Sequence, residues 1–505
     1  MFLVDRYLTR AAERSPDRVA LSVPGAGAER RHVRYAELEG LVERAADAFS
    51  ALGLRRGDRL LAASDNSLEL VVSAFGAMRA GGCFSLLHPA TKGRKIGEIV
   101  ARCTPKVLVL GDRQAALEPE IRGAAHGADP RTLVLGASFE EALAGASPAP
   151  RPSRIDLDLA AIFWTSGSTG VPKGVMLAHQ NMKSTTVSIA TYLENRADDV
   201  ILSALPLSFG YGWFQVTASM RMGACVALER GFQMAYPLIE AIARERATGL
   251  PGVPTLFSLL LSLRELDTTM LESLRYWTVA GAAMAPAQVR RMREVAPKAQ
   301  PFVMYGLTEC TRVTYLPPGD LEDRPLSCGL GMPNQDAWVE REDGAPAAPG
   351  EVGELIIRGA NVMRGYWQDP EGTARALRPG RVPGEVELRS GDLFKADGEG
   401  YLYFVARKDD VIKSGGQKVS PREIEAALLE HPGIAECAVI PVEDAMLGQA
   451  AKAFLVPKAD ATLDEKEVKR HLQKLLEDYM IPKQWAIVES LPKSENGKIL
   501  KRELK

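Results

Sequence analysis

The sequence predicts an α/β protein with a large N-terminal domain of layered, mostly parallel sheets and helices, followed by a small α+β C-terminal domain. Up to about residue 400, short apolar runs alternate with helical stretches, as in parallel sheets covered by helices. The 505 residues also exceed the usual length of one domain. A charged segment, RKDD at residues 407–410, precedes a separate pattern of helices and strands. We therefore expect domains at residues 1–408 and 409–505.

The N-terminal domain begins with a stretch whose apolar residues recur at helical spacing between charges (residues 1–21), which predicts an amphipathic helix. The next elements follow in order: a strand at 59–63, a helix at 68–80, a strand at 106–111, a strand at 160–164 and a helix at 180–192. Residues 112–152 are rich in Ala, Gly and Pro and are expected to be connecting structure. The alternation in GEVGELIIRG (350–359) is β-like, and residues 378–387 are loop-like.

The C-terminal domain is expected to be a compact βαβ-like unit of roughly 95 residues, which is enough for a small domain. Its predicted elements are a helix at 422–430, strands at 435–442 and 452–457, a helix at 464–478 and a strand at 485–488.

Composition excludes several classes of protein. Hydrophobic residues make up 46% and charged residues 25%, which are ordinary globular values. The net charge of −2 gives no indication of a nucleic-acid or anionic-membrane partner. Six scattered cysteines without a CxxC pair argue against a zinc site or a disulfide framework. No apolar stretch approaches the roughly 20 residues needed for a membrane span, so we expect a cytoplasmic protein.

A glycine-rich loop, TSGSTGVPK at residues 165–173, lies between two apolar runs. Small hydroxyl residues and glycines allow backbone N–H groups and hydroxyls to surround phosphate oxygens, and a lysine adds positive charge. The pattern GxxxxGK[ST] cannot be fitted, which excludes a P-loop GTPase or ATPase. The alternative is an ordinary flexible turn. The residues predicted to contact the nucleotide here are Thr165, Ser166, Gly167, Ser168, Thr169, Gly170 and Lys173.

This loop resembles the signature loop of the adenylate-forming superfamily, which comprises acyl- and aryl-CoA ligases, peptide-synthetase adenylation domains and firefly-type luciferases. The resemblance covers nearly the whole chain, because further motifs of the family follow in the family's order. They are YGLTE (305–309), SGDL (390–393), RKDDVIK (407–413), SGGQKVSPREIE (414–425) and LPKSENGK (491–498). The resemblance implies an enzyme that uses ATP and Mg²⁺ to form an acyl-adenylate and then transfers the acyl group to a thiol.

The resemblance also implies roles for single residues around the nucleotide. Glu309 would hold Mg²⁺ at the phosphates, since Mg²⁺ prefers a carboxylate together with phosphate oxygens, and Thr308 would bond the α-phosphate. Asp392 and Arg407 would bind the ribose hydroxyls. The adenine would stack on Tyr305, opposite the backbone of Gly281, Ala282 and Ala283. Gly306, which follows Tyr305, is also expected to contact the nucleotide. For an isolated Glu or Tyr, a solvated or a core position would be the usual alternative.

Four further features concern the expected mobile C-terminal domain. By resemblance, Lys498 bridges carboxylate and phosphate during adenylation, and Asp409 is the hinge about which the small domain rotates. Rotation would remove Lys498 and bring Ser414, Gly415 and Gly416 to a tunnel for the thiol, with Lys413 near the second-step site. Without the resemblance, Lys413 and Lys498 would be read as solvent-exposed lysines.

The acyl pocket is expected at LPLSFGYGWFQ (205–215), through Phe209, Gly210, Tyr211 and Gly212. Phe209 stands where many CoA ligases of the family carry His, which leaves the acceptor open. Amino-acid-activating relatives carry Asp where this chain has Gly210, and a buried ammonium without a partner is costly. We therefore expect an acid without an α-ammonium group, with an aromatic or alicyclic body. Trp213 and Phe214 either line the pocket or pack the core.

Four functions remain open from the sequence. The first is an acid–thiol ligase that transfers the acyl group to coenzyme A. The second is a stand-alone adenylation enzyme that loads a carrier protein, because both acceptors present the same phosphopantetheine thiol. The third is a non-catalytic acyl-nucleotide binding protein, against which Lys173, Glu309 and Lys498 argue; a luciferase-like oxygenase is a further member of the family to be tested.

Overall fold

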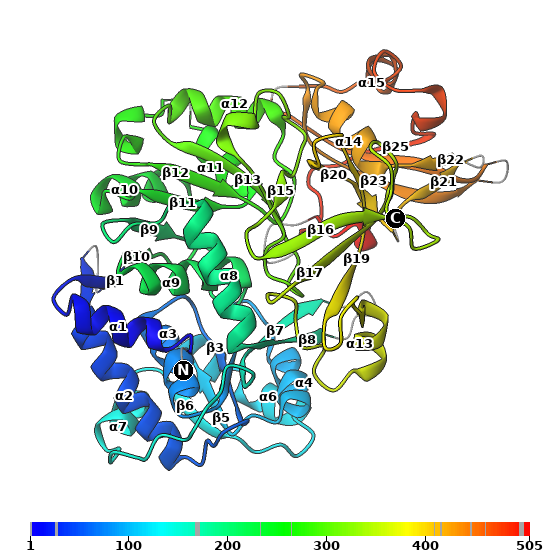
Figure 1. Cartoon of the computed structure of the whole chain (residues 1–505). Coiled ribbons are helices and arrows are strands. Elements are labelled where there is room, and N and C mark those ends of the chain that lie inside the picture. The colour runs from blue at the N-terminus through cyan, green and yellow to red at the C-terminus, as the bar shows by residue number, and fades with distance from the viewer. Residues whose placement is uncertain are drawn as a thin grey trace.

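Four sheets organise the described part of the chain in the computed structural model, three in the N-terminal part and one in the C-terminal part (Figure 1). The structure describes residues 3–25, 29–166, 172–232, 234–263, 265–408, 410–414, 417–444, 447–459, 461–493 and 499–504. All statements below concern these residues.

The first sheet has six strands in the order β6-β5-β3-β4-β7-β8. Its pairs are parallel except for β7 and β8, which are antiparallel and flank the glycine-rich loop. The strands are β3 Arg59–Ala63, β4 Cys83–Leu87, β5 Val107–Leu110, β6 Arg131–Val134, β7 Leu159–Ser166 and β8 Pro172–Ala178. The helices of this region are α1 Arg6–Arg14, α2 Tyr35–Ala51, α3 Leu68–Arg79, α4 Gly93–Cys103, α5 Asp112–Ala115, α6 Glu118–Ala124 and α7 Ala137–Ala144.

The second sheet has nine strands in the order β15-β14-β13-β12-β11-β9-β10-β1-β2, with a parallel centre and antiparallel edges. Its strands are β1 Val19–Pro24, β2 Arg30–Arg34, β9 Val200–Ser203, β10 Cys225–Leu228, β11 Gly249–Gly252, β12 Tyr276–Val279, β13 Gln300–Tyr305, β14 Thr314–Leu316 and β15 Leu330–Gly331. The helices that follow it along the chain are α8 His179–Tyr192, α9 Gly210–Met222, α10 Ala235–Glu245, α11 Pro254–Leu261 and α12 Pro286–Val295, with short 3₁₀ turns at Thr268–Leu271 and Pro318–Asp320.

The two large sheets share one core through the helices between them. The ring of Trp213 on α9 lies 4.4 Å from that of Phe84 on β4 and 5.7 Å from that of Phe75 on α3. Trp213 and Phe214 are both fully buried. These two aromatics therefore pack the core, which resolves the alternative left open by the sequence.

The third sheet departs from the expectation of mostly parallel sheets, because all its pairs are antiparallel. Its order is β16-β17-β19-β18, with β20 on β19. The strands are β16 Gln335–Glu340, β17 Gly353–Gly359, β18 Leu377–Pro379, β19 Val386–Ala396 and β20 Leu402–Arg407, and the helix α13 Pro370–Ala376 precedes β18. The expected loop at 378–387 is thus partly strand, because β18 and β19 pair across a shorter connection.

The C-terminal unit has its own sheet and its own core (Figure 1, orange to red). The sheet order is β22-β21-β24-β23, with β25 parallel to β24. Its elements are β21 Ile412–Ser414, β22 Gln417–Val419, α14 Pro421–Leu429, β23 Ile434–Asp444, β24 Gly448–Pro457, α15 Glu465–Leu472, β25 Gln484–Ile487 and 3₁₀ turns at Asp478–Met480 and Lys501–Glu503. Helix α15 is shorter than predicted, because the chain after it turns Met480 and Ile481 into the same core as Val468.

Two other expectations are settled by the fold. Residues 112–152 contain α5, α6, β6 and α7 rather than connections alone, because Ile121, Leu133 and Phe139 are buried against the first sheet and its helices. The six cysteines are free thiols. Within the described ranges, no helix combines the length and apolarity that a membrane crossing requires.

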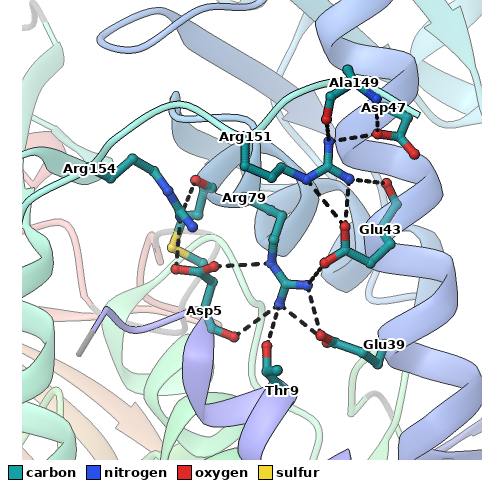
Figure 2. Close-up of polar contacts among 10 residues, drawn as sticks. Asp5, Thr9, Glu39, Glu43, Asp47, Arg79, Ala149, Arg151 and Arg154 are labelled. Atoms are coloured by element: carbon teal, nitrogen blue, oxygen red, sulfur yellow. Dashed lines mark hydrogen bonds and ion pairs between the residues drawn. The ribbon is translucent and has the colours of Figure 1, made fainter. Parts of the chain in front are cut away.

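A buried ionic network joins the N-terminal helix to the first sheet's helices (Figure 2). Arg79, at the end of α3, is 1% exposed, and its Nε lies 3.1 Å from Oδ2 of Asp5, which is fully buried. The same guanidinium bonds Glu39 at 2.8 Å and also Glu43, both on α2. Arg154 reaches the other carboxylate oxygen of Asp5 at 3.0 Å. The network fixes α1, α2, α3 and the segment after α7 relative to one another.

Candidate active site

The turn that follows β13 is the centre of the candidate site, because its residues 305–312 contact three clusters of side chains from distant parts of the chain. Strands β12 and β13 are parallel neighbours, with Val279 opposite Val303. The two following segments, 281–283 and 305–309, therefore leave the same edge of the sheet, where open α/β sheets bind ligands. Gly281 has φ +88°, a conformation that favours glycine, and Ala282 and Ala283 are exposed.

The first cluster joins Tyr305, Asp392 and Arg407, which were predicted as adenine and ribose contacts. The Tyr305 hydroxyl donates to Asp392 Oδ2 at 2.5 Å, and Arg407 Nε donates to Asp392 Oδ1 at 3.3 Å. Asp392 and Arg407 are opposite each other in the β19–β20 pairing. Burial and the Asp392 carboxylate raise the pKa of Tyr305 well above its usual value, so the phenol stays protonated and donates. The rings of Tyr305 and Phe394 pack in an edge-to-face arrangement, with their centres 4.9 Å apart.

The second cluster joins Lys173 and Glu309 through Tyr366, a residue that the sequence did not single out. Tyr366 donates its hydroxyl hydrogen to Glu309 Oε1 at 2.7 Å, and Lys173 Nζ lies 5.0 Å from the centre of its ring. Burial and Glu309 raise the pKa of Tyr366. Thr308 is half-buried in the turn beside Glu309. Lys173 starts from β8, where it is paired with Thr165 across the glycine-rich loop.

The third cluster contains the predicted acyl-pocket residues. A Cβ on Gly210, the first residue of α9, would lie 2.9 Å from Cγ2 of Thr311, so even one carbon is tight there. A Cβ on Gly212 would lie 2.4 Å from the Pro206 carbonyl oxygen, which requires glycine at that position. The Tyr211 hydroxyl bonds Thr278, with its oxygen 2.6 Å from Oγ1.

Arg312 is the second residue that the sequence reasoning missed. Its guanidinium carbon lies 4.5 Å from the centre of the Tyr211 ring, and the residue is 2% exposed. The Arg312 Nε is buried without a hydrogen-bond partner in the described part of the chain. A buried cation therefore lies against the ring of Tyr211, the residue after Gly210, whereas a binding site for a substrate ammonium would need an anion. The only signal in the sequence is that Arg312, three positions after Glu309, is the single charged residue in the segment 310–319.

Phe209 lies at the N-terminal end of α9, with its ring 5.7 Å from that of His88. Ser414 is buried at the end of β21, and Lys413 is opposite Lys418 in the β21–β22 pairing. Several predicted residues lie outside the described residues: Gly167, Ser168, Thr169, Gly170, Asp409, Gly415, Gly416 and Lys498.

Comparison with known proteins identifies the family of the chain. Residues 8–367 match the AMP-binding enzyme family, and residues 423–498 match the AMP-binding enzyme C-terminal domain. The chain is 32% identical over 515 residues to an indoleacetate–CoA ligase of Aromatoleum aromaticum, covering 99% of this chain and 97% of the relative.

Two solved structures share the whole fold. ATP-bound MatB from Rhodopseudomonas palustris has a TM-score of 0.89 at 30% identity, and the match covers 99% of this chain and 98% of MatB. The anthranilate CoA ligase AuaEII, in complex with anthranoyl-AMP, has a TM-score of 0.91 at 25% identity, and the match covers 100% of this chain and 96% of AuaEII. The chain belongs to the AMP-binding enzyme family and is an AMP-forming acid–thiol ligase of the adenylate-forming superfamily.

Proposed function

We propose that the protein adenylates a carboxylic acid with ATP and Mg²⁺ and transfers the acyl group to the thiol of coenzyme A. In the first step a carboxylate oxygen attacks the α-phosphorus and pyrophosphate leaves. In the second step the thiol sulfur attacks the acyl carbon and AMP leaves. The observation that carries the proposal is the turn at residues 305–312, which contacts the Tyr305–Asp392–Arg407 cluster, the Lys173–Tyr366–Glu309 cluster and the Gly210–Tyr211 cluster.

The residues present fit a magnesium ion held mainly by substrate. Mg²⁺ is usually bound through one or two carboxylates together with phosphate oxygens. Glu309 supplies one such carboxylate, and no group of three or more His, Cys, Asp or Glu side chains suited to a metal occurs in the described ranges. Mg²⁺ bound there would offset the negative charge of the phosphates. Lys173 adds a positively charged side chain at the glycine-rich loop, and Lys498 is proposed to add another from the C-terminal domain. Both charges would offset the negative charge of the phosphates.

We further propose that the acid has no α-ammonium group and has an aromatic or alicyclic body. Gly210 offers no carboxylate, and the buried guanidinium of Arg312, which lies against the ring of the neighbouring Tyr211, opposes a second cation nearby. The ring of Tyr211 supplies a flat apolar surface. The Aromatoleum relative and AuaEII are named for indoleacetate and anthranilate, both aromatic acids.

A second candidate function is the loading of a carrier protein, which Phe209 favours because it replaces a His common in CoA ligases. Both candidates are tested by pyrophosphate exchange over a panel of carboxylic acids, followed by mass analysis of the products with CoA and with carrier proteins. An acyl-CoA product at a rate comparable to exchange supports CoA as acceptor. Acylation of a carrier protein alone would support the second candidate, and absence of exchange with every acid would contradict both.

A further inference from the structure

Tyr366 lies between two groups of opposite charge that both belong to the candidate nucleotide site. Its hydroxyl donates to Glu309 Oε1 at 2.7 Å, while the ring faces the Lys173 ammonium at 5.0 Å. Lys173 and Glu309 do not form an ion pair with each other in the described structure. A neutral phenol thus contacts both charges.

The backbone around Tyr366 is fixed on both sides. On one side, Met176 N donates to Gly365 O at 3.0 Å and Trp367 N donates to Gly174 O at 2.7 Å, which attaches this segment to β8 just after Lys173. On the other side, Met363 N donates to Glu309 O at 2.8 Å. The segment therefore crosses from the first sheet to the turn after β13.

The conformation of Tyr366 is also specified locally. Its N–H donates to Thr373 Oγ1 at 2.9 Å, at the start of α13. Gly365 has φ +125°, and a Cβ there would lie 2.7 Å from Thr373 Cγ2, so only glycine fits before Tyr366. Tyr366 itself is 8% exposed. A side chain held in this way positions its partners rather than following them.

The hydrogen bond acts on one oxygen of Glu309 only. A phenol has a single hydrogen to donate, so the second carboxylate oxygen stays free to bind a cation. Groups that hydrogen-bond a metal-binding carboxylate set its orientation. The ring face attracts the ammonium of Lys173 without removing its hydrogens, so all three remain available for phosphate oxygens.

We propose that Tyr366 is a positioning residue that orients Glu309 toward Mg²⁺ and Lys173 toward the nucleotide phosphates while it keeps these two charges from pairing. The inference rests on the proposed function of the site and adds a residue to it.

The test uses the full-length protein with Tyr366→Phe, which removes only the hydroxyl, and Tyr366→Leu, which also removes the aromatic face. Calorimetry measures ATP binding with and without Mg²⁺, and pyrophosphate exchange gives the Mg²⁺ concentration for half-maximal rate. For Tyr366→Phe we expect this concentration to rise about 10- to 100-fold, the usual cost of losing a partner of a metal ligand. Metal-free ATP binding should be unchanged in Tyr366→Phe and weaker in Tyr366→Leu.

Tyr401→Phe is a matched control. Tyr401 is also 8% exposed, donates to the Asp320 carboxylate at 2.5 Å and has a cation, the Arg324 guanidinium, 4.1 Å from its ring centre. Tyr401 lies outside all three clusters. The Tyr401→Phe variant should therefore need the same Mg²⁺ concentration for half-maximal exchange as the unchanged protein. A general loss of stability would lower the active fraction in both variants without moving the Mg²⁺ midpoint.

Thr373→Val provides a second route if Tyr366→Phe folds poorly, because it removes the acceptor of the Tyr366 N–H. We expect a smaller shift of the Mg²⁺ midpoint in the same direction. If the unchanged protein binds Mg·ATP and Tyr366→Phe has the same Mg²⁺ midpoint, the inference is wrong while the proposed function stands. If the unchanged protein neither binds Mg·ATP nor exchanges pyrophosphate, both are wrong.

Discussion

Replacement of Arg79 by methionine should destabilise the N-terminal domain more than any surface charge change. The arginine is 1% exposed, and its loss leaves the fully buried Asp5 with Arg154 as its remaining ionic partner. It also removes the bonds to Thr9 at 3.0 Å and Glu39 at 2.8 Å (Figure 2). Removing one partner of a buried ion pair usually costs about 3–5 kcal/mol.

The expected change in melting temperature follows from the size of the domain. A unit of roughly 400 residues has an unfolding entropy of about 0.85 kcal/mol/K, so the midpoint should fall by about 4–6 °C. Calorimetry or circular dichroism at pH 7 measures this shift, and urea unfolding checks its sign.

Arg94→Met is the matched control for Arg79→Met. Arg94 pairs with Glu98 one helical turn away at 3.0 Å, and its side chain is 84% exposed. Exposed pairs of this kind contribute about 0.3–0.5 kcal/mol, so its midpoint should hardly change. The double variant Asp5→Asn/Arg79→Met should be less destabilised than the sum of its single variants, because it no longer leaves the buried Asp5 carboxylate with only one of its two arginines. Equal midpoints for Arg79→Met and Arg94→Met would refute the reasoning.

The remaining predictions concern pH, catalysis and specificity. Burial lowers the pKa of His179 to about 4, so the folded state holds it neutral while the unfolded state binds a proton below about 6.5. Unfolding should become easier as pH falls from 6.5 toward 4, and His179→Gln should flatten that part of the stability curve. Lys498→Ala should slow adenylation at least about a hundredfold, the usual cost of about 2.7–4 kcal/mol for a positioned charge; thiolation of a supplied acyl-adenylate should continue, and near-normal pyrophosphate exchange would exclude the role. Matched pairs such as benzoate and phenylalanine should be exchanged with clear preference for the acid without the amino group, and Arg312→Met should reduce that preference; a preference for phenylalanine in the unchanged protein would contradict our reading of the pocket.

Much of the site could be predicted from sequence because its motifs are contiguous. The glycine-rich loop is recognisable from nine residues in order, and β7 and β8 flank it as the apolar runs on either side indicate. Glu309 and Asp392 were found in the same way, within YGLTE and SGDL. The strand at 59–63 and the helix beginning at Leu68 were likewise predicted from local hydrophobic periodicity, which the buried sheet and the helix next to it impose.

Where local pattern failed, tertiary contacts decided the structure. Residues 112–152 looked like connections because Ala, Gly and Pro dominate them, yet buried apolar side chains pack α6, β6 and α7 against the first sheet and its helices. The all-antiparallel third sheet was not foreseen, because a strand's sequence does not specify the direction of its partner.

The sequence by itself determined the class of chemistry of this protein: which loop is predicted to surround phosphates, which carboxylates and lysines are available, and to which family the chain belongs. Only the tertiary structure decided which side chains meet. Tyr366 contacts Glu309 from 57 residues away and Tyr305 contacts Asp392 from 87 residues away. Arg312 acquires its place beside Tyr211 only when α9 packs against the turn after β13. Such contacts leave no local signature, because the hydrogen bond or ring contact that selects each residue exists only after distant strands have come together.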